Sequence, residues 1–269
     1  MTKLQAVSAL DGRYAGLTSE LCEIFSEYGL IKHRVQVEIE WLKFILSDLK
    51  LAGELTIDTD RLDRIVSEFS ENDAQAVKDI ERTTNHDVKA VEYFIKERLT
   101  DSGMDAIKEW VHFACTSDDI NNISYALMLD KGRILAIELL STLTGKIEEK
   151  ARDYQHVPMM SRTHGQPATP TTVGKEFVNF AWRIRQEIRC LERATVQAKI
   201  NGATGNYNAH HFVFPDVDWV GASQTFLAER LGLDPILWTT QINPNNSLAY
   251  ILHTLIRSAA VIIDFDRDM

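Results

Sequence analysis

Residues 161–170, which read SRTHGQPATP, bring a hydroxyl, a cation, an imidazole and an amide into one short segment. Two prolines stiffen its backbone, and the segment is too polar to belong to a hydrophobic core. A lone histidine is usually structural. Here the rigid polar setting between two long helical patterns favours proton transfer by His164, because an imidazole titrates near neutral pH.

The four residues at 11–14, Asp-Gly-Arg-Tyr, stand before the first helical pattern. Arg13 offers a planar fork of donors that suits phosphate, and Tyr14 offers a hydroxyl donor or a ring that can stack on a base. An ordinary turn with an exposed arginine explains the same residues. The segment is therefore a candidate nucleotide contact, with a plain turn as the alternative.

Two more clusters stand where a helix is expected to begin. The first, TTNHD at 83–87, combines the free N–H groups of a helix start, which bind anions, with His86 as a donor. Asn85 capping that helix beside a solvated histidine is the alternative. The second, TSDD at 116–119, begins a capping-box spacing at Thr116, but two adjacent hydroxyls with free N–H groups also suit a carboxylate. Both interpretations stay open for each cluster.

Glycine-bearing loops supply the last cluster. Residues 199–208 read KINGATGNYN and residues 239–241 read TTQ. Backbone donors approach a ligand closely at such glycines, and Gln241 can pair with a carboxylate or a base edge. Ordinary turns explain the glycines equally well.

Composition narrows the classes of function. The chain has 269 residues, 45% of them hydrophobic and 25% charged, which is typical of a soluble globular protein, and it lacks the GxGxxG, P-loop, HExxH and GxSxG motifs. A formal net charge of -10 argues against nucleic acid as a partner. The three cysteines have no ligand spacing, so no metal is expected. We see no membrane span or signal peptide and expect a cytoplasmic protein.

Apolar residues recur at helical spacing almost everywhere, and alternating strand patterns are nearly absent. The sequence predicts an all-α fold, with a small N-terminal helical domain at 1–111 and a long-helix bundle at 112–269. Residues 117–154 contain no proline and carry apolar positions on more than one face, which predicts a helix of roughly 55 Å. Such a helix needs partners on several sides, so assembly with other subunits is expected.

The prolines at 158–170 interrupt the helical pattern, and a second long helix is predicted at 172–198. A final helix begins near Ser247 and is still apolar at Met269, with no glycine cap, proline or polar tail. We therefore expect the natural polypeptide to continue, so that the bundle is incomplete at its C-terminus here.

At these clusters the sequence resembles the adenylosuccinate lyases, a branch of the fumarase and aspartase superfamily. Six segments fit the bacterial members in the same order: DGRY, ERTTNHDVKAVEYF, HFACTSDDINN, SRTHGQPATP, KINGATGNYNAH and TTQI. Gly165 is the distinguishing residue, because fumarases and argininosuccinate lyases typically carry leucine there. Asp118 stands where bacterial members have glutamate and keeps the charge.

The resemblance implies a β-elimination that releases fumarate from adenylosuccinate, giving AMP, and from the succinylated aminoimidazole carboxamide ribonucleotide. It implies His164 as the general acid, and a homotetramer whose sites combine segments of three subunits. It implies no metal and no organic cofactor. The implied substrate contacts, with a succinyl-carboxylate site at the two hydroxyl residues, are Arg13, Tyr14, Asn85, His86, Asp87, Thr116, Ser117 and Gln241.

The family's catalytic base is a serine on a Ser-Ser-x-Met-Pro-x-Lys-x-Asn loop, a motif that these 269 residues lack. A polypeptide ending at Met269 is therefore expected to turn substrate over negligibly. Another lyase of the superfamily is one alternative, which Gly165 disfavours. A catalytically silent helical scaffold is the other, and the presence of the serine loop in the full gene would separate it from an enzyme.

Overall fold

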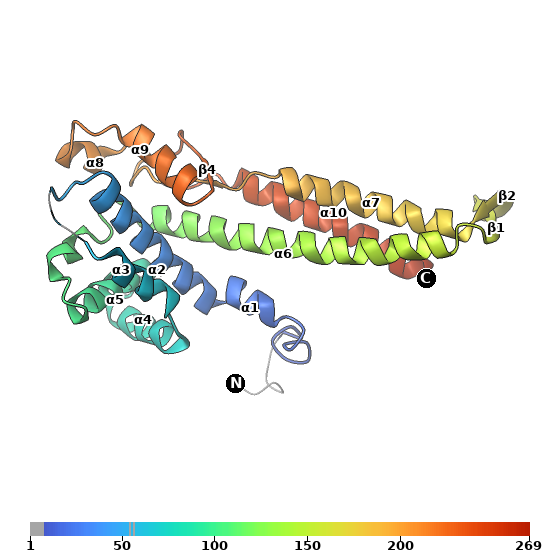
Figure 1. Ribbon diagram of the computed structural model, residues 1–269, viewed down its shortest axis with the longest axis horizontal. Coiled ribbons are helices and arrows are strands. Elements are labelled where there is room, and N and C mark those ends of the chain that lie inside the picture. The colour runs from blue at the N-terminus through green and yellow to red at the C-terminus, as the bar shows by residue number, and fades with distance from the viewer. Residues whose placement is uncertain (1–7, 54, 56) are drawn as a thin grey trace. The chain divides into compact units, whose positions relative to one another are not determined.

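The computed structural model describes residues 8–53, 55 and 57–269, and it confirms the all-α prediction (Figure 1). The residues group into two compact units, Met1–Asp130 with Val196–Pro244 and Lys131–Thr195 with Asn245–Met269. These units are not the division at residues 111 and 112 expected from the sequence, which stays a prediction about the domains of the whole protein.

Helices make up most of the first unit. They are α1 (Ser19–Phe25), α2 (Glu27–Lys43) with its π-helical end (Phe44–Asp48), α3 (Thr59–Ser67), α4 (Glu71–Thr84), α5 (Asp87–Asp101), a 3₁₀ turn (Asp105–Trp110), the start of α6 (Ser117–Asp153), α8 (Asn208–Val213), and α9 (Trp219–Thr225) with a π turn (Phe226–Arg230). Two short parallel strands, β3 (Gln197–Ala198) and β4 (Asp234–Pro235), pair with each other.

Helix α2 supplies the centre of the core of the first unit. Ser26 caps it by accepting from the Gly29 N–H at 3.1 Å. Trp41 is 1% exposed, and its ring lies 5.8 Å from Phe44 and 5.0 Å from Phe226, measured between centroids. Its indole N–H donates to the carbonyl oxygen of Phe113 at 3.0 Å. The aromatic core therefore also holds the loop that leads into α6.

The start of α5 differs from the sequence prediction, in which Asn85 was the cap. His86 is the N-cap, and its Nδ1 accepts from the Lys89 N–H at 3.1 Å. Asn85 instead ends α4 in the left-handed conformation, with φ of 51°. Asparagine tolerates that conformation better than most residues, which explains why it occupies the junction rather than the cap.

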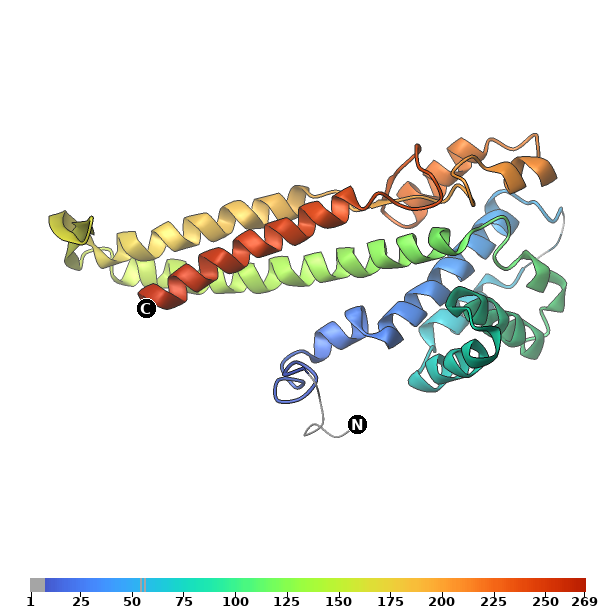
Figure 2. The ribbon, with the colours of Figure 1, turned by 180° about the vertical axis from the view of Figure 1, so that it is seen from behind.

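The second unit is built on long helices, as predicted. Its members are the later part of α6 (Ser117–Asp153), α7 (Val173–Arg193) and α10 (Asn246–Asp268), and Figures 1 and 2 show α7 and α10 side by side. Arg185 forms a two-pronged ion pair with Glu148 of α6, and Arg257 pairs with Glu187 at 2.9 Å. Helix α7 ends five residues before the predicted position 198, because 197–198 belong to the β3 strand.

A β-hairpin that the sequence pattern did not predict joins α6 to α7. Strands β1 (Pro158–Thr163) and β2 (Gln166–Thr172) pair antiparallel, with Thr163 opposite Gln166. The turn residues His164 and Gly165 have φ of 53° and 73°, as a type I′ turn requires. Prolines are tolerated because each strand of a two-stranded hairpin has a free edge.

Helix α10 is, among the described residues, the one helix whose length and apolar composition would fit a membrane crossing. It is also packed against α7 through a face that includes Ile251, Thr254, Ser258 and Val261, all buried. Of its two arginines, Arg257 is paired with the carboxylate of Glu187. A bundle helix passes the same test of length and composition, so the feature is weak evidence for a membrane.

We expect Trp41→Phe to lower the free energy of unfolding by about 2–3 kcal/mol, because it opens a cavity in the aromatic core and removes the donor to Phe113. Trp238→Phe is the matched control, since Trp238 is 91% exposed and should change stability by less than about 0.5 kcal/mol. Chemical denaturation of both variants measures the difference. Equal stabilities would show that Trp41 does not anchor this core.

Candidate active site

The head of helix α6 is organised by the carboxylate of Asp119, which is fully buried. Its Oδ2 accepts from the Thr116 N–H at 2.9 Å and the Gly202 N–H at 3.1 Å. Its Oδ1 accepts from the Asn201 N–H at 3.2 Å and from Lys199 Nζ at 2.8 Å. One side chain therefore fixes both the start of α6 and the loop that follows β3.

The predicted capping box is half formed. Asp119 accepts from the Thr116 N–H, but the Thr116 hydroxyl meets Gln241, whose Nε2 donates to it at 3.3 Å. Ser117 Oγ lies 3.3 Å from His86 Nε2. Four predicted residues from three separate segments thus meet at the head of α6, and their hydroxyls and donors face one another.

His86 presents a hydrogen-bond donor to this cluster. Its Nδ1 accepts from the Lys89 N–H, so in the neutral ring the proton is on Nε2, which donates to Ser117 Oγ. The cap therefore fixes both the orientation and the tautomer of the imidazole. A neutral histidine in this arrangement can donate to an anion without losing its role in α5.

Asp87 is held beside the cluster by Arg34, a residue of α2 that sequence reasoning missed. The guanidinium of Arg34 donates to Asp87 Oδ2 at 2.6 Å and to Asn121 Oδ1 at 2.8 Å. Partial burial would raise the pKa of Asp87, but the neighbouring Arg34 charge and the Val88 N–H outweigh it and hold the pKa below its usual range. Arg34 stands among other charged residues of α2, such as Lys32 and Glu38, so the sequence alone did not single it out.

Asparagine amides tie two loops to the first turns of α6. Asn122 pairs with both backbone groups of Lys199, donating to its carbonyl at 3.0 Å and accepting from its N–H at 2.9 Å. Asn243 donates to Asn122 Oδ1 at 3.2 Å, and its own N–H donates to Asp118 Oδ2 at 3.0 Å. The loop carrying Gln241 is thereby held against the same helix.

Gly205 lets the two loops approach each other. It has φ of 74°, and a Cβ there would overlap the carbonyl oxygens of Thr239 and Thr240. Asn201 Nδ2 donates to Thr239 Oγ1 at 2.8 Å across the same contact. Backbone packing therefore requires a glycine at this position of the predicted loop.

Residues 112–114, which precede α6, have a strained backbone that an ion pair holds in place. His112 and Ala114 both have positive φ, 64° and 57°. Buried Glu38 accepts from the His112 N–H at 3.1 Å and from its Nδ1 at 2.6 Å. Burial alone would lower the pKa of His112, but the Glu38 carboxylate outweighs it and raises the pKa above its ordinary value. This ion pair holds the loop that delivers Thr116.

The other predicted residues lie in different places. Arg13 and Tyr14 are in the turns before α1, where the guanidinium stacks 5.3 Å from the ring centroid of Tyr14. Within the described part of the chain, no hydrogen bond joins their side chains to the head of α6. His164 belongs to the second unit, exposed at the turn of the β1–β2 hairpin.

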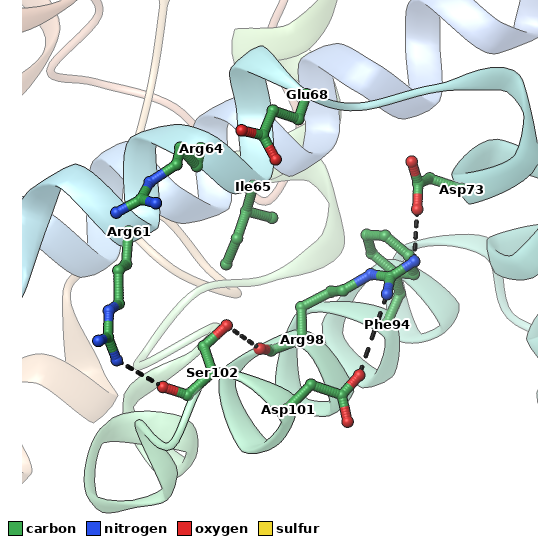
Figure 3. Close-up of a pocket in the computed structure, with 9 residues that line it drawn as sticks. All are labelled: Arg61, Arg64, Ile65, Glu68, Asp73, Phe94, Arg98, Asp101 and Ser102. Atoms are coloured by element: carbon green, nitrogen blue, oxygen red, sulfur yellow. Dashed lines mark hydrogen bonds and ion pairs between the residues drawn. The ribbon is translucent and has the colours of Figure 1, made fainter.

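A pocket of about 590 Å³ lies elsewhere in the first unit (Figure 3). It lies between α3, the start of α4 and the C-terminal half of α5, whose lining residues stand roughly 10–21 Å along that helix from Asp87. Each of its three arginines has a partner, since Arg98 pairs with Asp73 and Asp101, Arg61 donates to the Ser102 carbonyl and Arg64 donates to the Asp60 carbonyl. None of the residues that line this pocket belongs to the predicted site.

Comparisons with known proteins place the chain in a family. A model of the family described as "Lyase" matches residues 12–269. The chain belongs to this lyase family. It is 46% identical over 274 residues to the adenylosuccinate lyase of Escherichia coli (strain K12) and 44% identical over 274 residues to that of Vibrio cholerae. Each alignment covers 100% of this chain but 60% of the relative's length.

Solved structures of other enzymes share the fold. The β-carboxy-cis,cis-muconate cycloisomerase of Acinetobacter calcoaceticus matches with a TM-score of 0.74 at 19% identity, over 95% of this chain and 58% of that one. A fumarate lyase from Mesorhizobium matches with a TM-score of 0.73 at 16% identity, over 93% of this chain and 56% of that one. At these identities the likeness shows the fold of the lyase family alone.

In the part of the chain that the structure describes, no group of three or more His, Cys, Asp or Glu side chains is placed to hold a metal ion. The expectation that the protein needs no metal or organic cofactor stays a prediction.

His210 is a buried histidine next to this site. Its ring is fully buried, 4.8 Å from Trp219 and 5.5 Å from Tyr207 between centroids, and neither ring nitrogen has a hydrogen-bond partner among the described residues. Burial lowers the pKa of His210 to about 4. The folded protein therefore holds this imidazole neutral.

Acid should destabilise the protein through His210. In the unfolded state His210 has the ordinary pKa of 6.5, whereas in the folded state its pKa is about 4. The stability that neutral His210 contributes is therefore complete above pH 6.5 and is lost as the pH falls from 6.5 to 4. Between pH 7 and pH 4, we expect the free energy of unfolding of His210→Phe to fall by about 3 kcal/mol less than that of wild type. Urea denaturation at several pH values measures this.

Exposed His253, in the second unit, provides the control, since His253→Phe leaves the surroundings of His210 unchanged and should keep the acid-induced loss of stability. A His210→Phe variant whose stability falls with acid as steeply as wild type would contradict a neutral buried His210.

Proposed function

We propose that the full-length protein is an adenylosuccinate lyase, which eliminates fumarate from adenylosuccinate to give AMP. The same reaction on the succinylated aminoimidazole carboxamide ribonucleotide belongs to the proposal. Relatives bearing that name match the whole chain. The observation that carries the proposal is the meeting of Thr116, Ser117, His86 and Gln241 at the head of α6.

This cluster suits a carboxylate of the succinyl group. Two hydroxyls, one imidazole N–H and one amide N–H face one another, and the first-turn N–H groups of a helix have no partner within the helix. Removing a proton next to a carboxylate places negative charge on that carboxylate. Fixed donors stabilise this charge as it develops, which lowers the barrier to elimination.

His164 is proposed as the acid that protonates the departing nitrogen. The I′ turn presents its imidazole in solvent, beyond the paired strands, and Gly165 supplies the second left-handed residue of that turn. A leucine at this position would be strained in the same turn. The base is proposed to be a serine on a loop motif that these 269 residues do not contain.

The proposed assembly is a homotetramer with sites shared between subunits. Helix α10 buries one apolar face and leaves a second one exposed, which includes Leu252, Ile256 and Ile263 at 45%, 64% and 49%. On α7, Trp182 is 58% exposed. Helices that are apolar on two sides need further partners, and copies of the same chain supply them. We place the protein in the cytoplasm, with a small-molecule substrate and neither nucleic acid nor membrane as partner.

We expect His164→Ala in the full-length protein to lower the rate of adenylosuccinate cleavage by at least about 100-fold, because general-acid catalysis is lost. His156→Ala is the matched control, since His156 is also exposed in the second unit and has no proposed role. The fall in adenylosuccinate absorbance gives both rates. Equal activity of the two variants, or no turnover by wild type, would refute this function.

We expect Ile256→Glu to shift the full-length protein to smaller assemblies, because it places a charge on the exposed apolar face of α10. Ile256→Val keeps that face apolar and should leave the mass unchanged. Light scattering after size exclusion measures the mass. An unchanged mass in Ile256→Glu would show that this face is not an interface between subunits.

A further inference from the structure

The ion pair between Asp119 and Lys199 lies directly behind the proposed carboxylate site. Both side chains are 0% exposed, and Nζ lies 2.8 Å from Oδ1. Lys199 Nζ also lies 3.5 Å from the carbonyl oxygen of Gly202. Burying two charges is costly, so a buried pair at this position calls for an explanation beyond stability.

The Asp119 carboxylate accepts from four donors. Three of them are backbone N–H groups, and the fourth is the ammonium of Lys199. Removing Lys199 would leave the three backbone bonds in place. The geometry of the loops and the charge of the site can therefore be altered separately.

A dicarboxylate ligand meets an electrostatic problem at this helix start. Asp118 and Asp119 both lie in the first turn of α6, and Asp119 contacts the backbone of Thr116 itself. An uncompensated carboxylate so close to an incoming carboxylate would repel it. The buried ammonium of Lys199 offsets the charge of Asp119 without occupying the ligand site.

We infer that Lys199 is a positioning residue that neutralises Asp119, which lets the head of α6 bind a dicarboxylate while Asp119 holds Thr116 and the 201–202 backbone in place. The inference rests on the proposed function for the location of the carboxylate site. Lys199 acts through Asp119 and does not itself contact the substrate.

Binding of fumarate to the full-length protein tests this role, with AMP as a second probe. Lys199→Met removes the charge but keeps the length of the side chain, and Lys199→Arg keeps the charge. We expect Lys199→Met to lower the affinity for fumarate by at least ~10-fold and to keep the affinity for AMP within about 3-fold of wild type. Lys199→Arg should bind fumarate with an affinity within about 3-fold of wild type. Calorimetry gives both affinities, and circular dichroism confirms folding.

Two further variants keep the test sharp. Lys43→Met removes another cation from a paired, largely buried setting, where Lys43 contacts Glu40 and Asp63 at 2.8 and 2.6 Å. It should lower stability and leave fumarate binding unchanged. If Lys199→Arg does not fold, Lys199→Gln serves in its place, because it removes the charge but keeps a hydrogen-bond donor, and it should weaken fumarate binding as much as Lys199→Met does.

Equal fumarate affinity in wild type and Lys199→Met would overturn the inference, as would a parallel loss of fumarate and AMP binding, or a wild type that does not bind fumarate. A different outcome separates the two claims: wild type and variants bind fumarate in the expected order, but wild type does not cleave adenylosuccinate. That result would refute the proposed function and leave the inference standing.

Discussion

The carboxylate of Asp119 accepts from four N–H donors that belong to the start of α6 and to the loop after β3. Because these donors come from segments about eighty residues apart, the bonds fix one segment against the other. The amides of Asn122 and Asn243 extend the same network to the loop that carries Gln241. The head of α6 is therefore ordered by buried polar contacts, whereas the apolar core fixes the helices.

This difference between polar contacts and the apolar core explains which features could be predicted from the sequence. The long α6 helix follows from apolar periodicity over residues 117–154. The polar clusters could be found because their residues do not fit the polar face of any predicted helix. The cap of α5 and the hairpin were not predicted, because they depend on the left-handed residues Asn85 and His164. Arg34 was missed because its partners, Asp87 and Asn121, are distant in sequence.

The two units carry different parts of the proposed chemistry. The first holds the donors that suit a carboxylate, fixed by the Asp119 network, and the second presents the imidazole of His164 on an exposed hairpin. A two-stranded hairpin has little core of its own. In the proposed tetramer, assembly through the exposed face of α10 would bring segments of other subunits to each active site. The proposed elimination needs both an acid and an anion site, which agrees with the lyase family assignment.

The most direct measurement of this account is a crystal structure of the full-length protein with fumarate and AMP bound. We predict that one fumarate carboxylate lies within hydrogen-bond distance of the Thr116 and Ser117 hydroxyls, with Lys199 still paired to Asp119 behind it. Fumarate bound away from the head of α6, or Lys199 turned from Asp119 to contact the ligand itself, would contradict the account.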